Sequence, residues 1–415
     1  MSDVPPELFP DILSRMPVES LLRFRSVCKS WRRIIDNPSF IKMHLHRQME
    51  GGELVLRNYV GTRLYTLSSD SLKCCKSRTN TIWAEPLKSL KLVGVPRIPI
   101  LPVSSSCHGL ILFSHNKQKQ KKIWALWNPY TRESLQLPPF DDASYRIIVP
   151  SSGVGYDCIS DDYKVVRLAR FDDPMNSRVR LLETLVYSLK SDCWRRIKYF
   201  PDCFFPELGQ TGVFVHGALH WMTDFWRHLE IQGVPQGIIA FDLGTENYRM
   251  FQFPSALSSP ERPNYLDALG GCLLATCSDS VYRLDDYGGE DLWTMLFSFR
   301  GMGFGDMRPI AYLKSKGEVL LRCVSDEADK YLWYDIEKKT VKKVSVDGFT
   351  ECYSSQIWPA SLVRLGNNSG FDENNYANCT AKKKRKRSNN DRLELTFTTS
   401  DVQKAIYTNN YRNYW

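Results

Sequence analysis

An aromatic-rich hairpin recurs through most of this 415-residue chain and constrains its fold more than any other feature. In each copy a short strand of aromatic and branched residues ends in a polar turn, and an apolar residue opens the return strand. The return residues lie 63, 59, 54, 45 and 48 positions apart and are Leu72, Leu135, Trp194, Tyr248, Trp293 and Val341. A period near 50 residues is typical of the four-stranded blade of a β-propeller, and we expect about six blades.

A second hairpin precedes the first in most units. Its turn is marked by a glycine, as at Gly109, Gly217, Gly270 and Gly317, or by Asp161 in the third unit. Glycine suits a tight turn that needs a positive φ. The first unit is too short for four strands. We therefore predict that residues 354–363 return to complete it, unless residues 76–103 hide a seventh blade.

The first 45 residues have a different period. Apolar residues at helical spacing, such as Leu8, Ile12 and Leu13, predict three short amphipathic helices, with Pro17 ending the first and Pro38 ending the third. A unit this small is close to the lower limit for an independent core. It should therefore pack against another part of the chain or bind a partner.

This stretch resembles the F-box in its plant form. The matching positions include Val4-Pro5, Ile12-Leu13, Val27-Cys28-Lys29, Trp31 and His44-Leu45, with Val4 where leucine is usual. The resemblance implies docking to a Skp-type adaptor and, through it, to a cullin–RING ubiquitin ligase. The residues that it assigns to adaptor binding are Val4, Pro5, Leu8, Ile12, Leu13, Leu21, Leu22, Val27, Cys28 and Trp31.

The following region resembles the F-box-associated domain of plant F-box/kelch proteins. The motifs that carry this resemblance are Asn128-Pro129-Tyr130-Thr131-Arg132, Gly155-Tyr156-Asp157 with Asp161-Asp162-Tyr163-Lys164, and Gly217-Ala218-Leu219-His220-Trp221. It implies a mainly β chain, with an F-box at 1–48 and a kelch-like β-propeller at 52–365. After Leu365 the composition shifts to Gly, Asn, Lys and Arg, which predicts a disordered basic tail at 366–415. It also implies a substrate-recognition subunit whose propeller loops bind a protein target, expected to be a component of defence signalling.

Charge is concentrated in the tail. Six of the nine net positive charges lie in one run, which leaves 9 − 6 = 3 for the rest of the chain, so we expect no nucleic-acid-binding surface on the folded part. The run predicts a nuclear-import signal. With no apolar stretch long enough for a membrane span and no secretory signal pattern, we expect the protein in the cytoplasm and nucleus. The run consists of Lys382, Lys383, Lys384, Arg385, Lys386 and Arg387.

Other reactive-looking patterns have structural interpretations. His216 and His220, with Cys203 upstream, lack the cysteine pair of a zinc site. The glycines of 301–305 are not followed by a helix, as a phosphate-binding loop requires. The acidic pairs Asp141-Asp142, Asp161-Asp162, Asp172-Asp173 and Asp285-Asp286 lie in expected turns. We therefore predict no catalytic residues, metal or cofactor. Two alternatives stay open: an enzyme with its site in the propeller channel, and a non-degradative scaffold bound to the adaptor.

Overall fold

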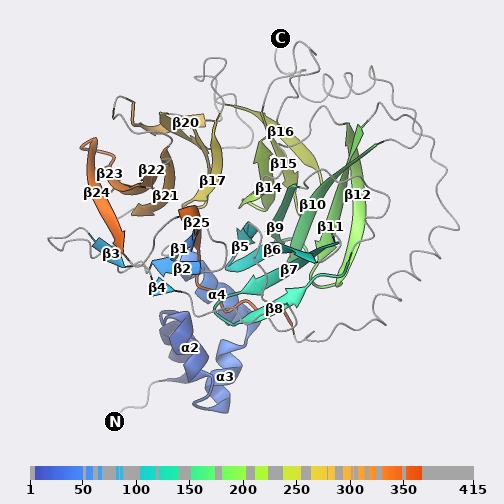
Figure 1. Ribbon diagram of the computed structural model, residues 1–415. Helices are drawn as coiled ribbons and strands as arrows, with labels where there is room; N and C mark the ends of the chain where they lie inside the picture. Colours follow the sequence, from blue (N-terminus) through green and yellow to red (C-terminus); the bar gives the residue numbers. More distant parts are fainter. Residues whose placement is uncertain are drawn as a thin grey trace, which may run out of the picture.

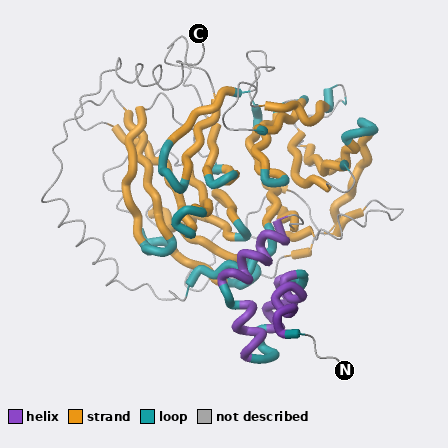
Figure 2. The backbone as a smooth tube through the Cα atoms, turned by 180° about the vertical axis from the view of Figure 1, so that it is seen from behind, coloured by secondary structure: helices purple, strands orange, loops and turns teal. Residues whose placement is uncertain are grey.

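Figure 1 shows a computed structural model of the chain, with a small group of helices beneath a ring of β-sheets. Figure 2 shows the same arrangement from behind. The structure describes residues 5–49, 53–58, 64–67, 81–83, 85–86, 103–117, 121–139, 151–172, 180–201, 211–222, 237–253, 263–277, 279–285, 293–300, 302, 307–313, 317–323, 330–347 and 352–366.

The N-terminal unit contains four α-helices after a short 3₁₀ turn at Pro6–Leu8. Pro10 lies in the first turn of the first helix, where its missing N–H costs no hydrogen bond. The first three helices match the expected ones. The helices are α1 (Phe9–Ser14), α2 (Val18–Phe24), α3 (Lys29–Ile35) and α4 (Pro38–Met49).

The fourth helix corrects the expectation of a three-helix domain. Pro38 ends α3 as predicted, but it also starts α4, because proline is favoured at the first position of a helix. The side chain of Asn37 accepts a hydrogen bond from the Ser39 amide at 2.8 Å, which caps the new helix.

In the described residues the strands form six sheets, which confirms the mainly β propeller fold of about six blades. We number the sheets as blades in chain order. Blade 1 contains β25 (Cys352–Trp358), β1 (Glu53–Asn58), β2 (Leu64–Leu67) and β4 (Glu85–Pro86). Blade 2 contains β5 (Val103–Cys107), β6 (Leu110–Lys117), β7 (Lys121–Asn128) and β8 (Glu133–Gln136). Blade 3 contains β9 (Ser151–Asp157), β10 (Asp162–Asp172), β11 (Arg180–Ser188) and β12 (Cys193–Pro201).

The remaining three blades follow the same order. Blade 4 contains β13 (Val213–Val215), β14 (Ala218–Met222), β15 (Gly237–Asp242) and β16 (Tyr248–Gln252). Blade 5 contains β17 (Tyr265–Leu269), β18 (Cys272–Thr276), β19 (Ser280–Leu284) and β20 (Trp293–Ser298). Blade 6 contains β21 (Met307–Leu313), β22 (Glu318–Cys323), β23 (Lys330–Asp335) and β24 (Thr340–Asp347), with β3 (Thr81–Trp83) added at its outer edge.

The innermost strands are β25, β5, β9, β13, β17 and β21, and from β5 onward each contacts the next up to β25. The predicted return residues from Leu135 to Val341 lie on the fourth strands of blades 2–6, whereas Leu72 lies outside the described residues. The glycine-marked turns join the first and second strands of their blades. Gly109, Gly217, Gly270 and Gly317 all have positive φ, as does Asp161 in blade 3.

The ring is closed by the end of the chain, as predicted. Strand β25 pairs antiparallel with β1 in a register that sets Leu54 opposite Ile357 and Glu53 opposite Trp358. Pro359 follows the last residue of β25, so its missing N–H leaves no gap in the ladder. The sequence does not predict a second connection: β3, which lies between β2 and β4 of blade 1 in the chain, pairs in parallel with β24 of blade 6. In the described part, residues 76–103 thus contribute β3 to blade 6, β4 to blade 1 and the first residue of β5 to blade 2, and they form no seventh sheet.

Residues 359–366, which we call the strap, continue beyond β25 between the helices and the propeller. Only the first part of the predicted strand, up to Trp358, is therefore a strand. Ala360 and Leu362 belong to the apolar core of the helices, with Leu13, Val18 and Phe40 among others. Val363 and Leu365 belong to the core shared by blades 2 and 3, which also takes Leu45 from α4. The strap and α4 therefore join the two parts of the chain into one packed body.

Candidate protein-interaction site

Exposed apolar side chains lie in the 3₁₀ turn before α1, on α1 itself and in the turn before α3, and α1 and α3 contact each other. Leu8 is 50% exposed, Ile12 45% and Val27 63%. Pro5 and Cys28 are exposed beside them. Leaving such side chains in water forgoes about 1.5–3 kcal/mol each, which binding to an apolar partner would recover. We call Pro5, Leu8, Ile12, Val27, Cys28 and Trp31 the apolar surface.

Leu13 and Leu21 require a correction to the expected docking residues. They are only 2% and 0% exposed and form the centre of the helical core. Their side chains support the apolar surface from beneath and are not available to a partner. Leu22 is half-buried against the same core. Val4 lies outside the described residues.

Trp31 fixes the relative positions of α1, α2 and α3. Its ring packs against Phe9 with the ring centroids 6.2 Å apart, and against Phe24 at 5.3 Å in an edge-on arrangement. The sulfur of Cys28 accepts a hydrogen bond from the Trp31 amide at 3.4 Å and caps α3. Trp31 is half-buried, so it both holds these helices together and presents one side to solvent.

Ion pairs reinforce this small unit. Arg25 donates two hydrogen bonds to the Asp36 carboxylate, at 2.6 and 2.9 Å. Burial raises the pKa of Asp36, but the hydrogen bonds and charge of Arg25 outweigh it and hold the pKa below its usual value. Arg47 of α4 similarly donates to Asp11 of α1 at 2.5 Å, so the ends of the domain are tied together.

The helices contact one face of the propeller. This face carries the turns between first and second strands and between third and fourth strands, and we call it the turn face. Lys42 of α4 pairs with Asp161 in the β9–β10 turn at 2.7 Å, and Tyr156 also donates to Asp161. The hydrogen bond to Asp161 raises the pKa of Lys42. A Cβ added at Gly109, in the β5–β6 turn, would lie 2.4 Å from Cβ of Ser361 in the strap.

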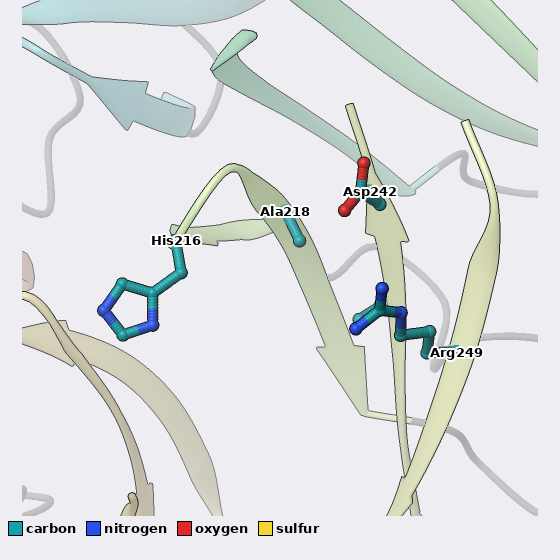
Figure 3. Close-up of a pocket in the computed structure, with 5 residues that line it drawn as sticks. His216, Ala218, Asp242 and Arg249 are labelled. Atoms are coloured by element: carbon teal, nitrogen blue, oxygen red, sulfur yellow. The ribbon is translucent and has the colours of Figure 1, made fainter. Parts of the chain in front are cut away.

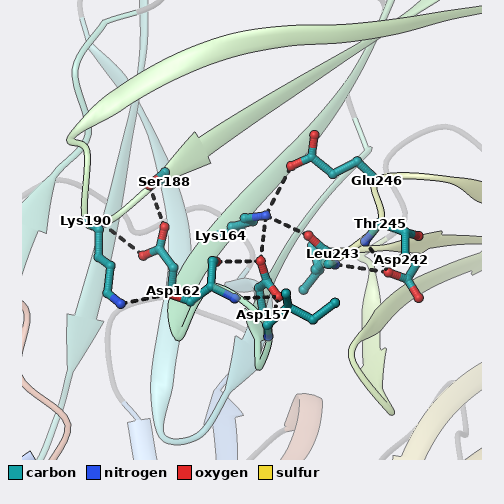
Figure 4. A network of polar contacts seen from close by, with 12 residues as sticks. Asp157, Asp162, Lys164, Ser188, Lys190, Asp242, Leu243, Thr245 and Glu246 are labelled. Carbon is teal, nitrogen blue, oxygen red and sulfur yellow. Dashed lines mark hydrogen bonds and ion pairs between the residues drawn. The ribbon is translucent and has the colours of Figure 1, made fainter.

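The acidic motif of blade 3 has a structural role. Figure 4 shows Lys164 of β10 surrounded by acceptors from blades 3 and 4. Its Nζ lies 2.8 Å from Asp157, 3.1 Å from Glu246 and 2.7 Å from the carbonyl oxygen of Leu243. Burial acts to raise the pKa of Asp157, yet hydrogen bonds from Lys164 and Ser160 lower it overall. The ion pairs and hydrogen bonds of Lys164 thus connect blade 3 to blade 4.

A small pocket with a volume of about 110 Å³ lies in blade 4. It is lined by His216, Ala218, Ala240, Asp242 and Arg249. Figure 3 shows His216 on the turn before β14 and Arg249 extending from β16 toward β15. Asp242 accepts hydrogen bonds from the Gly244 and Thr245 amides, at 3.0 and 2.7 Å, so its carboxylate stabilises a turn.

The two histidines that suggested metal spacing occupy different environments. His216 is exposed, whereas His220 is fully buried on β14 with Nδ1 3.1 Å from the carbonyl oxygen of Val213. Because a carbonyl only accepts, Nδ1 of His220 must carry the proton. Cys203 lies outside the described residues. No group of three metal-ligating side chains occurs in the described part of the chain.

Hydrogen bonds join the innermost strands of blades 2 and 3 to Gly212, which directly precedes β13 of blade 4. Ser105 of β5 donates a hydrogen bond to the carbonyl oxygen of Gly212 at 2.7 Å, and the Gly212 amide donates to Ser152 of β9 at 2.7 Å. A Cβ at Gly212 would lie 2.7 Å from the Trp221 ring. The acidic pair Asp161-Asp162 lies at the β9–β10 turn, as predicted. Asp172 ends β10, and Asp285 follows β19. The other members of the predicted acidic pairs lie outside the described residues: Asp141, Asp142, Asp173 and Asp286.

Comparison with known proteins identifies the class. Residues 1–43 match the F-box domain, and residues 93–363 match the F-box associated beta propeller domain, which is more than half of the chain. The chain therefore belongs to the F-box proteins that carry an F-box-associated β-propeller. It is similar to F-box protein CPR1 of Arabidopsis thaliana, with 30% identity over 395 residues, 88% of this chain and 89% of that protein. It is also 26% identical to the F-box/kelch-repeat protein At3g23880 of the same plant, over 72% of this chain and 80% of the relative.

The strap is a structural element that the sequence does not reveal. The sequence predicts a strand for its residues 359–363, and Asn128 is part of a family motif. The one available signal was that Asn128 is an asparagine where other blades have serine or aspartate, as at Ser188, Asp242 and Asp335.

Proposed function

We propose that this protein is the substrate-recognition subunit of a Skp–cullin–F-box ubiquitin ligase. The observation that carries the proposal is the apolar surface on an F-box domain that is packed firmly onto one face of a propeller. Burial of Leu8, Ile12 and Val27 against a Skp-type adaptor would supply the binding energy, and the cullin–RING part of the ligase would follow through that adaptor. The chain itself makes or breaks no bond; it raises the local concentration of a target near the ubiquitin-charged enzyme.

The target is proposed to bind the face of the propeller opposite the F-box domain. The turn face is partly covered by α4 and the strap, and its turns are short. The connections that begin and end on the opposite face are longer, such as those between Met222 and Gly237 and between Gln136 and Ser151. Variable loops on a rigid scaffold are where recognition is usually placed. A component of defence signalling is our proposed target, from the resemblance of the sequence to F-box proteins that restrain pathogenesis-related genes.

The basic run Lys382–Arg387 lies outside the described residues, and we propose it as a nuclear-import signal that divides the protein between cytoplasm and nucleus. In the described residues no helix is long and apolar enough to cross a membrane. Replacing the six basic residues with alanine should move a fluorescently tagged chain toward the cytoplasm. An unchanged nuclear fraction would reject the signal.

A target trap tests the proposed function. The Ile12→Asp variant should lose the adaptor while its propeller still holds targets, so proteins that it retains become candidates. A true target is then ubiquitinated by the wild-type chain in a reconstituted ligase, and its abundance rises when this protein is removed from cells. Captured proteins that are bound but never ubiquitinated would instead favour the non-degradative scaffold. Turnover of small substrates without any adaptor would favour the enzyme.

A further inference from the structure

One position recurs at the start of the turn between the third and fourth strands. In blades 2, 3, 4 and 6 it is held by Asn128, Ser188, Asp242 and Asp335. Each side chain accepts a hydrogen bond from a backbone amide two or three residues later. Four residues after each position the backbone has a positive φ, at Arg132, Asp192, Glu246 and Lys339. The four turns are therefore built alike, and capping the turn needs only an acceptor.

Asn128 does more than cap its turn. Its Oδ1 accepts from the Tyr130 amide at 3.0 Å, as the equivalent residues do. Its Nδ2 donates to the carbonyl oxygens of Ser361 and Val363 in the strap, at 3.0 and 2.7 Å. Asn128 is fully buried. An aspartate has no such donor, and a serine is too short to reach, so among these four positions only Asn128 can hold the strap.

The strap in turn has two sides. Ala360 and Leu362 pack into the F-box core, while Val363 and Leu365 pack into the propeller core. Glu133, five residues after Asn128, accepts from the Leu365 amide at 2.9 Å and pairs with Arg364 at 3.0 Å. Any movement of the strap must therefore change the position of the F-box domain relative to the propeller.

We propose that Asn128 is a positioning residue for ubiquitin transfer: through the strap it sets the orientation of the F-box domain, and with it the adaptor, relative to the target-binding propeller. The proposal rests on the proposed ligase function. Transfer requires a lysine to reach the ubiquitin-charged enzyme, so a fixed orientation limits which lysines are modified. Adaptor affinity itself is set at the apolar surface and does not depend on Asn128.

The sharpest variant is Asn128→Asp. Aspartate already occupies the equivalent position in blades 4 and 6, so the turn keeps its acceptor. The carbonyl oxygens of Ser361 and Val363 in the strap lose both hydrogen bonds from residue 128 and face a carboxylate instead. Asn128→Ser, the residue of blade 3, is a second variant without the added charge. Asp335→Asn in blade 6 is the matched control, because the same exchange is made in reverse where no strap is present.

Three measurements on the full-length chain test the proposal. Hydrogen exchange should become roughly tenfold faster or more in 360–365 and 38–45 for both Asn128 variants, but not in blade 5. Adaptor affinity should be unchanged. In a ligase reconstituted with adaptor, cullin–RING and ubiquitin-charged enzyme, mass spectrometry of the chain's own modified lysines should show a broader set for both variants than for the wild type. Asp335→Asn should match the wild type throughout.

The proposal is overturned if both Asn128 variants keep the wild-type exchange and lysine set, if both unfold the propeller, or if Asp335→Asn gives the same changes. A wild-type chain that binds no adaptor would instead contradict the ligase function, so the two failures are distinguishable.

Discussion

Asn128 donates a hydrogen bond to the carbonyl oxygen of Val363 at 2.7 Å, across 235 residues of sequence. The contact joins a turn of blade 2 to the segment that follows the last strand of the ring. Because Leu362, immediately before Val363, packs among F-box residues, this hydrogen bond also ties the F-box domain to the propeller. The propeller closure and the domain junction are thus consecutive parts of one C-terminal segment.

Shortening the chain from its C-terminus should separate these two roles. A chain ending after Gly366 should unfold like the full-length protein. A chain ending after Trp358 keeps β25 but lacks the strap, so the F-box domain should melt at lower temperature and apart from the propeller. A chain ending after Asp347 also lacks β25, which exposes two strand edges and should cause aggregation. Calorimetry measures all three, and a single shared transition for the two longer chains would contradict the strap's role.

The close approach of the strap to blade 2 can be tested with a pair of glycines. Gly109 and Gly217 occupy equivalent turns, with φ values of 80° and 77°. Alanine at Gly217 meets no atom within 4 Å, so it should cost only the backbone strain, about 1–2 kcal/mol. Alanine at Gly109 would also collide with Ser361 and should cost about 1–3 kcal/mol more. Equal losses in urea unfolding would show that the strap does not press on this turn.

The buried lysine of blade 3 should be essential for stability. Lys164→Met leaves the Asp157 carboxylate buried without its cation, which should lower the free energy of unfolding by on the order of 3–5 kcal/mol. Lys338→Met serves as control, since Lys338 pairs with Asp335 while its side chain is 75% exposed, and it should change stability little. Similar effects from the two substitutions would mean that the network in Figure 4 does not join blades 3 and 4.

Much of the fold follows from local sequence because each hairpin carries its own signal. Glycines mark the first turns, and aromatic strands such as Trp333-Tyr334 lie in the third position of their blades. Closure was predictable because a sheet ring must cover its edges. The strap was not, because nothing local distinguishes Leu362, which packs on the helices, from Val363, which packs on the propeller.

The sequence predicts the apolar residues of the F-box domain as a set but does not separate the exposed ones from the buried ones. Leu13 and Ile12 are adjacent and both apolar, yet one is in the core and the other is exposed. Helical periodicity shows that a helix is apolar along one stripe. It does not decide which of two neighbouring apolar residues faces the core when the helix also carries exposed apolar side chains. The fourth helix was missed for a related reason, since Pro38 both ends one helix and begins another.

Acid should destabilise the propeller through His220. Burial lowers the pKa of His220 from 6.5 to about 4, despite its hydrogen bond to Val213. Above pH 6.5 the ring is neutral in both states. Between pH 6.5 and about 4 the unfolded chain binds a proton that the folded chain excludes, so the free energy of unfolding falls by up to about 1.4 kcal/mol per pH unit for this residue as pH falls. Below about 4 both states are protonated and the dependence ends.

A glutamine exchange checks this assignment. His220→Gln keeps an N–H donor but cannot titrate, so its unfolding free energy should depend less on pH over that window. Parallel pH profiles for wild type and His220→Gln would contradict the assignment.

Binding of a purified Skp-type adaptor, measured by isothermal titration, is the decisive test of docking at the apolar surface. Ile12→Asp puts a charge into the apolar surface and Ile159→Asp makes the same exchange in the β9–β10 turn, where Ile159 is 74% exposed. Unpaired burial of a carboxylate costs several kcal/mol, so Ile12→Asp should weaken binding by roughly a hundredfold or more. We expect equal affinity for wild type and Ile159→Asp, and loss of binding for Ile12→Asp. Undiminished binding by a folded Ile12→Asp chain would contradict docking at this surface.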